Sequence, residues 1–179
     1  GEKWRLIPKN SDKPVYLAIN SDEGEPGTFK DRQILEFDPH LLIEGIICAS
    51  YALNAHHAYI YIRGEYVFWT NRFQEAIDEA YEAGILGSTV LGHPFALDVT
   101  IHRGAGAYIC GEKTALLESL EGKRGHPRLK PKGKEPEWFF GNPTIVNNVE
   151  TSASLPCIIQ EGYQAYRRYG TEESPGTML

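Results

Sequence analysis

The sequence predicts an α/β fold in which helices cover both faces of a parallel sheet. Short segments rich in β-branched and aromatic residues alternate with longer amphipathic segments, in the order strand, helix, strand, helix, strand, helix. A glycine-rich turn joins the third predicted strand to the next helix, and its glycines allow the backbone to turn sharply. With 179 residues, the chain is long enough for one such domain with a hydrophobic core.

The first half of the chain supplies two strands and the helix between them. Residues 15–19 form a short apolar run that predicts a buried strand. Residues 41–53 are mostly apolar, which predicts a helix packed against the sheet. Asp38 and Pro39 provide a capping carboxylate and a proline suited to the first turn of that helix. Residues 58–63 are aromatic and β-branched, as is typical of a strand.

The second half continues the alternation and then interrupts it. Residues 71–83 place apolar side chains on one helical stripe. Residues 96–102 are expected to form the third strand, and residues 112–120 the helix after the glycine-rich turn. Residues 123–143 contain several prolines and no clear periodicity, so we expect a long irregular loop of functional importance. Residues 147–159 return to a helical pattern.

Composition excludes several classes of function. The net charge is −6 and 41% of the residues are hydrophobic, which is ordinary for a globular protein and argues against a nucleic-acid surface. No segment approaches 18 consecutive apolar residues, and no signal-peptide pattern is present. We therefore expect no nucleic-acid partner and no direct insertion into a membrane.

The three cysteines argue against a metal cluster held by this chain. Cys48, Cys110 and Cys157 are far apart and form no CxxC pair. Their odd number and apolar neighbours predict reduced, buried thiols in a reducing compartment.

The most informative stretch is residues 20–32, which directly follow the first predicted strand. The amide of Asn20 and the carboxylates of Asp22, Glu23 and Glu25 crowd this turn. Open α/β sheets place ligands at the carboxyl ends of their strands, so the stretch predicts one wall of a polar pocket. A plain surface turn could have the same composition, and both interpretations stay open on these residues alone.

A second motif, residues 103–112, reads Arg-Gly-Ala-Gly-Ala-Tyr-Ile-Cys-Gly-Glu. It follows a strand and opens a helix, where glycines let a phosphate, a ribose or a flat ring approach the backbone closely. Its spacing is not the usual G-x-G-x-x-G, so a ligand site and a purely structural turn are about equally supported.

A third motif, residues 142–151, contains two adjacent asparagines just before a predicted helix. Capping of the helix accounts for one of them. Two neighbouring amides, Asn147 and Asn148, also suit the edge of a heteroaromatic ring, because amides both donate and accept hydrogen bonds.

In this order and at these spacings, the three motifs resemble the flavin-bearing, NADH-oxidising subunit of respiratory complex I. That family comprises the F-type subunit of bacterial NADH–quinone oxidoreductase, the 51-kDa mitochondrial subunit, and the diaphorase subunits of NAD-linked hydrogenases and formate dehydrogenases. The matching segments span nearly the whole chain: 20–32, 38–40 with 44–45, 59–66, 103–112, 121–131 and 143–151.

The resemblance implies a Rossmann-like domain that binds FMN and receives a hydride from NADH. No side chain is assigned as a general acid or base, and none as a metal ligand, because the flavin itself carries the chemistry. The positions that match the flavin site are Lys3, Asn20, Asp22, Glu23, Gly24, Tyr108, Gly111, Glu112, Asn147 and Asn148. Glu25, Lys113 and Lys130 match positions for the nicotinamide nucleotide.

Some positions depart from the family pattern. Lys113 stands where the family usually has glutamate. A cation there would favour a 2′-phosphate, so NADP(H) is an alternative to NAD(H); a solvent-directed Lys113 is the other interpretation. Gly133 replaces a phenylalanine that stacks on adenine in the family. Lys132 and Lys134 make the same loop more basic, which would fit a more anionic ligand; for these two lysines we prefer the interpretation of a solvated charged loop.

The resemblance also implies segments beyond this sequence. The rest of the family's first glycine-rich loop would precede residue 1, and a [4Fe–4S] cluster would lie on a C-terminal segment. Both ends therefore look cut rather than native. We expect residues 1–170 to form the FMN- and NAD-binding domain and residues 171–179 to begin a linker to a following domain.

The predicted function is FMN-dependent oxidation of NADH, with electrons passed to iron–sulfur clusters of NADH–quinone oxidoreductase. The expected partners are other complex I or diaphorase subunits, notably the small [2Fe–2S] subunit. The expected location is cytoplasmic and peripheral on the inner face of the cell membrane, or on the matrix side in mitochondria. The alternatives are a diaphorase subunit of a hydrogenase or formate dehydrogenase, and a catalytically silent docking scaffold.

Overall fold

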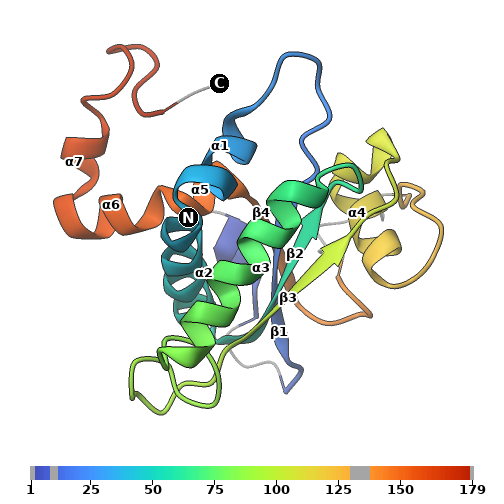
Figure 1. The fold of residues 1–179 in the computed structure, drawn as a ribbon, viewed down its shortest axis with the longest axis horizontal. Helices are drawn as coiled ribbons and strands as arrows, with labels where there is room; N and C mark the ends of the chain where they lie inside the picture. The colour runs from blue at the N-terminus through green and yellow to red at the C-terminus, as the bar shows by residue number, and fades with distance from the viewer. Residues whose placement is uncertain (1–2, 9–11, 130–137, 178–179) are drawn as a thin grey trace.

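The computed structural model describes residues 3–8, 12–129 and 138–177. In this part of the chain, four parallel strands form one sheet in the order β3-β2-β1-β4 (Figure 1). The strands are β1 (Val15–Ser21), β2 (Ala55–Ile62), β3 (Asp98–Arg103) and β4 (Thr144–Asn148). The predicted parallel α/β sheet is confirmed.

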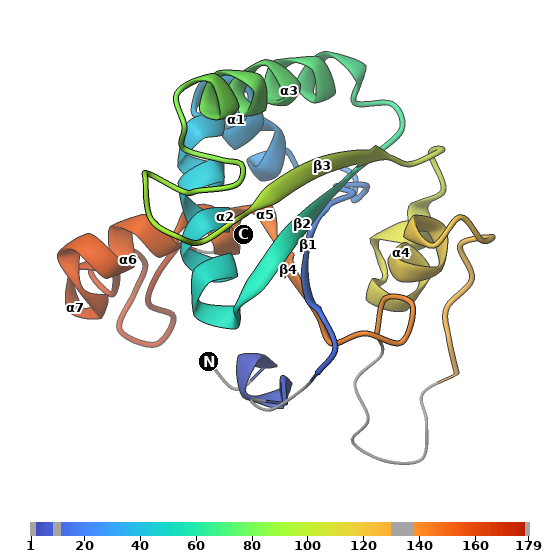
Figure 2. The same cartoon turned by 90° about the horizontal axis from the view of Figure 1, so that it is seen from below.

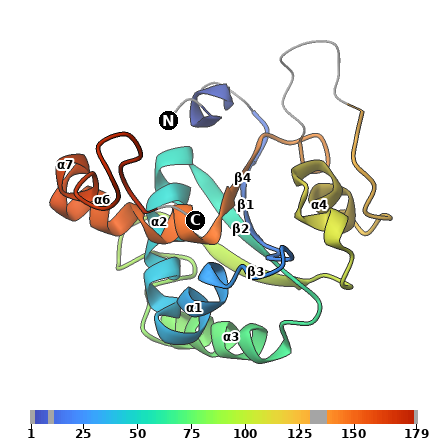
Figure 3. The same cartoon turned by 90° about the horizontal axis from the view of Figure 1, so that it is seen from above.

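Helices cover both faces of the sheet (Figure 2). The helices α1 (Lys30–Phe37), α2 (Pro39–Leu53) and α3 (Val67–Glu82) lie on one face, and α4 (Lys113–Leu120) lies on the other. Beyond β4 the chain forms α5 (Val149–Ala153), α6 (Leu155–Glu161) and α7 (Tyr163–Tyr166). Figure 3 shows α6 and α7 on the side of the sheet away from α4. Two short 3-10 helices, η1 (Lys3–Leu6) and η2 (Tyr108–Gly111), complete the described elements.

Alternation along the strands divides the core into two clusters. Leu17 and Ile19 of β1 join the larger cluster beneath α1, α2 and α3. Ala18 of β1 and Tyr61 of β2 point the other way, into a smaller cluster with Leu116 and other residues of α4. Successive side chains of a strand face opposite sides of a sheet, so β1 buries apolar side chains on both of its faces because helices cover both.

The predicted capping of α2 is confirmed. The Asp38 side chain accepts a hydrogen bond from the Leu41 amide at 3.2 Å, with Pro39 in the first turn. Farther along the helix, Gly45 lies against the Ser152 carbonyl of α5, where a Cβ atom would collide with backbone. The missing side chain therefore allows α2 and α5 to approach closely.

Three local features differ from the expectations. Residues 147–148, expected to begin a helix, form the edge strand β4 together with residues 144–146. The segment after the acidic turn contains the helix α1, which the sequence analysis did not predict. Only Cys110 is buried; Cys48 and Cys157 are partly exposed, although all three are free thiols.

Within the described residues, no helix combines the length and apolarity that crossing a membrane requires. The same part of the chain contains no cluster of three or more His, Cys, Asp or Glu side chains able to hold a metal ion.

Candidate cofactor site

The topology creates a crevice between β1 and β4. From β1 the chain builds β2 and β3 on one side, and it then returns to place β4 on the other side of β1. Ligands of open α/β sheets bind at the carboxyl ends of the strands where the order reverses in this way. A pocket of about 150 Å³ lies there, and we call it the β1–β4 crevice. Six of the residues predicted from the sequence line it: Asn20, Asp22, Glu23, Glu25, Gly111 and Asn148.

Asn20 joins the end of β1 to the glycine-rich turn. Its Nδ2 donates to the Gly111 carbonyl at 2.8 Å, and its Oδ1 accepts from the Asp22 amide at 3.1 Å. Gly111 itself lies close to Asp22, because a Cβ atom there would be 3.3 Å from the Asp22 carbonyl oxygen. Two of the three sequence motifs are therefore held together by this one amide.

Asp22 is a half-buried carboxylate with other charges nearby. Burial raises its pKa to about 6; the Arg63 guanidinium opposes the shift, and the carboxylates of Glu65 and Glu25 add to it. Without a ligand, a negative charge at this point is unfavourable. A ligand group that donates hydrogen bonds to Asp22 would relieve that cost.

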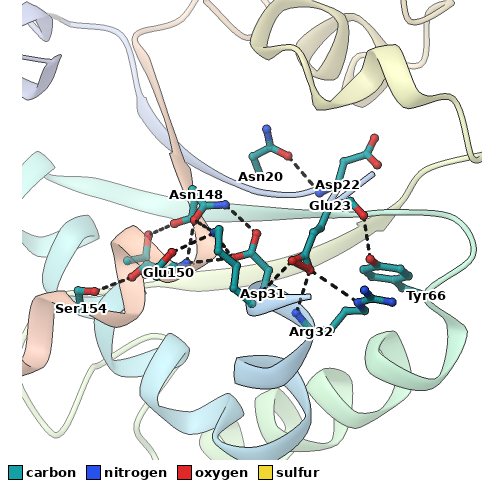
Figure 4. Close-up of polar contacts among 11 residues, drawn as sticks. Asn20, Asp22, Glu23, Asp31, Arg32, Tyr66, Asn148, Glu150 and Ser154 are labelled. Carbon is teal, nitrogen blue, oxygen red and sulfur yellow. Dashed lines mark hydrogen bonds and ion pairs between the residues drawn. The ribbon is translucent and has the colours of Figure 1, made fainter. Parts of the chain in front are cut away.

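The side chain of Glu23 has a structural task. Its carboxylate accepts hydrogen bonds from the amides of Asp31 and Arg32, at 3.2 and 3.3 Å, at the start of α1 (Figure 4). Its carbonyl accepts from the Tyr66 hydroxyl at 2.8 Å. Burial raises the pKa of Glu23, while the two amide hydrogen bonds oppose that shift. Glu23 thus fixes the shape of the acidic turn, and its carboxylate is already satisfied.

Gly24, Glu25 and Tyr108 form the outer edge of the site. A Cβ atom on Gly24 would lie 2.8 Å from the Tyr108 ring, so the glycine lets the ring rest on the turn. The Tyr108 hydroxyl is 3.5 Å from Glu25 Oε1, and the residue is 63% exposed. An exposed aromatic face beside a carboxylate suits a heteroaromatic ligand that also carries hydroxyl groups.

Glu112 caps the helix that follows the glycine-rich turn. Its carboxylate accepts from the amides of Thr114 and Ala115 at 2.9 and 3.0 Å. Burial would raise its pKa, but the hydrogen bonds from Thr114 and Ala115 and the charge of Lys113 lower it. Like the carboxylate of Glu23, the carboxylate of Glu112 caps the start of a helix. Glu112 would therefore influence a ligand through the backbone that it positions.

The two asparagines have different roles. Asn148 caps α5 by accepting from the Glu150 amide at 3.0 Å, and its Nδ2 donates to Asp31 Oδ2 at 2.7 Å. Asn147 is 6% exposed, and its Nδ2 is buried without a hydrogen-bond partner in the described part of the chain. Buried donors are rarely left unpaired. The unpaired Nδ2 of Asn147 is therefore a donor that a ligand could use at the carboxyl end of β4.

Lys3 and Lys113 bring positive charge to β4 and to the start of α4. The Lys3 ammonium donates to the Val146 carbonyl of β4. Burial and the charge of Lys113 both lower the pKa of Lys3. Lys113 is exposed at the first position of α4. Lys130, with the neighbouring Lys132, Gly133 and Lys134, lies outside the described residues.

A buried ion network that the sequence did not predict lies at the base of the crevice (Figure 4). The Lys30 ammonium lies 2.7 Å from Asp31 Oδ1, 2.8 Å from Asn148 Oδ1 and 3.2 Å from Glu150 Oε2. Burial would lower the pKa of Lys30, but Asp31 and Glu150 raise it overall. The sequence shows Lys30 and Asp31 side by side after the acidic turn, but not that Glu150 would meet them.

The chain is similar in sequence to known proteins. The family described as "Nuo51 FMN-binding domain" matches residues 1–157. The second F-type subunit of NADH-quinone oxidoreductase from Rhizobium meliloti (strain 1021) is 55% identical over the whole chain, which covers 42% of that protein. The F-type subunits of the same enzyme from Aquifex aeolicus (strain VF5) and Streptomyces coelicolor are 55% and 52% identical over the same 179 residues, which cover 42% and 40% of them.

Solved structures share the fold of this chain. A crystal structure of an NAD+-reducing [NiFe]-hydrogenase in the H2-reduced state matches with a TM-score of 0.85 and 40% sequence identity. The match covers 98% of this chain and 29% of the hydrogenase chain. The chain thus spans about two fifths of the curated relatives it matches. Since the family match covers most of the sequence, the chain belongs to the Nuo51 FMN-binding domain family.

Proposed function

We propose that the longer protein containing this chain oxidises NADH with bound FMN and passes the electrons to iron–sulfur clusters of an NADH–quinone oxidoreductase. The observation that carries this proposal is the β1–β4 crevice, together with the unpaired donor of Asn147, which precedes the crevice residue Asn148 in β4. Membership of an FMN-binding family and the names of the NADH-quinone oxidoreductase relatives support the same conclusion.

The residues present fit a flavin mononucleotide. Asn20 and Asn147 offer amides for the polar edge of the ring, and Asn147 has a buried donor still to be paired. The carboxylate of Asp22 suits ring N–H or ribityl hydroxyl groups, since its charge is unfavourable without a donor. Gly24 and Gly111 leave room for close approach along the backbone.

Bound flavin would accept two electrons from a nicotinamide and release them singly. The protein's part is to bind and orient. Tyr108 would border the flavin and Glu25 would face the nicotinamide nucleotide at the exposed edge, where an aromatic face and a carboxylate meet. Glu23 and Glu112 would keep the two turns in place through the helix starts they cap. Lys3 and Lys113 would lie toward the anionic parts of the ligands.

Absorption spectroscopy tests the cofactor proposal. The complete subunit should purify with a flavin spectrum near about 450 nm. Replacing Asn147 by alanine should weaken FMN binding by about tenfold, the usual effect of losing one good hydrogen bond to a ligand. The control is Asn142→Ala, because Asn142 serves a turn before the other end of β4. A colourless wild-type protein would refute FMN binding and favour the docking scaffold.

The nucleotide preference is a separate proposal. Lys113 would weaken discrimination against a 2′-phosphate, because a cation at the site attracts it. The test compares the NADH and NADPH values of kcat/KM for the complete subunit and its Lys113→Glu variant. The variant should shift the ratio toward NADH by about tenfold. An unchanged ratio would mean that this exposed side chain serves only the solvent-facing surface of α4.

The second candidate is a diaphorase subunit, which runs the same half-reaction with another acceptor. It is favoured by the similarity to the NAD+-reducing hydrogenase. The two candidates differ in what co-purifies with the protein at native expression level: membrane-bound quinone reductase subunits or a hydrogenase. Electron transfer from NADH to quinone in the isolated complex would exclude the diaphorase.

The proposed assembly follows the same reasoning. Residues 1–170 would be the FMN- and NAD-binding domain, and residues 171–179 would begin a linker. The complete subunit would carry a [4Fe–4S] cluster and contact the small [2Fe–2S] subunit, at the inner face of the membrane. Cross-linking of the native complex, with mass-spectrometric identification of the linked peptides, tests these contacts.

A further inference from the structure

Tyr61 is a fully buried tyrosine that the proposed function does not use directly. It lies on β2, is 1% exposed, and faces α4. Its hydroxyl is 2.9 Å from the Ser119 hydroxyl of α4. Burial raises its pKa; the hydrogen bond with Ser119 opposes this shift, and a hydrogen bond with the Cys110 thiol adds to it. The hydroxyl therefore stays protonated and bridges two elements.

The same hydroxyl supports both ends of the glycine-rich turn, residues 103–112. At the start of the turn, a Cβ atom on Gly104 would lie 2.7 Å from the Tyr61 oxygen, so the backbone rests directly on it. Near the end, Cys110 of η2 lies in the same buried cluster as Tyr61. The His102 ring, just before the turn, stacks on the Tyr61 ring with centroids 5.3 Å apart. One side chain thus lies against residues at the start of the turn and shares a cluster with a residue near its end.

The position of the turn relative to the sheet matters because the turn contains residues of the proposed site. Tyr108, Gly111 and Glu112 belong to it, and Gly111 is tied to Asn20 at the end of β1. A movement of the turn would move the exposed ring and the backbone that line the site. Such displacements of well-placed groups affect ligand binding even when no contacting residue is changed.

We propose that the Tyr61 hydroxyl is a positioning group of the cofactor and nucleotide site, acting through the turn formed by residues 103–112. The consequence for substrate binding rests on the proposed function above. The mechanical part, that the hydroxyl holds the turn closed over Cys110, does not.

Cys110 offers a direct readout of that closure. Its thiol is 5% exposed. Gly125, in the segment after α4, lies so close to the Cys110 sulfur that a Cβ atom there would collide with it. A thiol beneath these backbone segments can react with an alkylating reagent only after they open. Its rate of alkylation therefore measures how firmly the turn is held.

The experiment compares Tyr61→Phe with Tyr59→Phe in the complete subunit. Tyr59→Phe removes the same oxygen from the same face of the same strand, where the ring packs against Phe139 rather than against the turn. Cys48→Ser and Cys157→Ser in the background leave Cys110 as the cysteine followed in its peptide by mass spectrometry. Ser119→Ala removes the partner on α4 and replaces Tyr61→Phe as the test if that variant does not fold.

For Tyr61→Phe we expect KM for NADH to rise about fivefold with kcat within about twofold, and Cys110 to be alkylated about fivefold faster. Tyr59→Phe should change neither quantity. Equal behaviour of the two variants in both measurements would overturn the proposal. If the wild-type subunit held no flavin, the proposed function would fail, whereas the alkylation comparison would still decide whether Tyr61 holds the turn.

Discussion

Replacing Asp22 by asparagine should stabilise the protein in the absence of flavin. In the folded protein burial raises the pKa of this carboxyl to about 6, against an ordinary value of 3.8. Between these two pH values the folded chain keeps a proton that the unfolded chain has lost. Stability therefore falls as pH rises from about 4 to about 6 and then levels off. Asparagine has no such titration, so the variant should not show this fall.

The structure bounds the size of the effect. The gap between 3.8 and about 6 corresponds to a ceiling of about 3 kcal/mol. Asp22 is only half buried, and solvent screens its charge, so the realistic value is about 1 kcal/mol at pH 7.5. The gain would come at the expense of flavin binding, because the carboxylate is the group we expect to meet the ligand's donors.

The assay is urea unfolding followed by tryptophan fluorescence at pH 4.5 and pH 7.5. From pH 4.5 to pH 7.5, the free energy of unfolding of Asp22→Asn should rise by about 1 kcal/mol relative to that of wild type. Asp12→Asn, which alters an exposed residue before β1, controls for the general loss of one charge. If the difference in free energy of unfolding between Asp22→Asn and wild type is the same at both pH values, the inference that the Asp22 charge destabilises the fold is refuted.

Three further predictions concern the framework of the site. Asp38→Ala should lower the free energy of unfolding by about 1 kcal/mol, because the Leu41 amide loses its cap; urea unfolding measures this. Gly45→Ala should lower it by about 2 kcal/mol or more, since a Cβ atom would collide with the Ser152 carbonyl; a melting temperature equal to wild type would contradict that close contact. Lys30→Met should cost about 3 kcal/mol, because it leaves the buried carboxylate of Asp31 without a positive charge beside it, and a loss below about 1 kcal/mol would show that solvent reaches the network.

Much of the site could be predicted because its residues come in three compact motifs. The strand that leads into Asn20 and Asp22 is visible as an apolar run that changes abruptly to polar residues. Parallel strands bring their carboxyl ends to one edge, so this placement follows from local pattern and topology together. The β1–β4 crevice does contain residues from all three motifs, including Gly111 and Asn148.

What each side chain does there could not be predicted. Glu23 and Glu112 are both carboxylates beside glycines in the sequence, which suggests ligand binding. In the structure, both carboxylates accept hydrogen bonds from amides at the starts of helices. Capping and ligand binding use the same side-chain oxygens, and only the backbone geometry decides whether an oxygen accepts from a helix amide or from a ligand. Asn148 likewise caps a helix, which leaves its neighbour Asn147 with the unpaired donor.

The sequence alone determined the class of fold, three strands and the helices α2, α3 and α4, because their hydrophobic periodicity is local. Only the tertiary structure decided that residues 144–148 are the edge strand β4, since five residues that pair with β1 have no distinctive period of their own. It also decided that Lys30 meets Glu150 and that Tyr61 supports the glycine-rich turn. These contacts join residues far apart in the chain, and packing, not local propensity, brings them together.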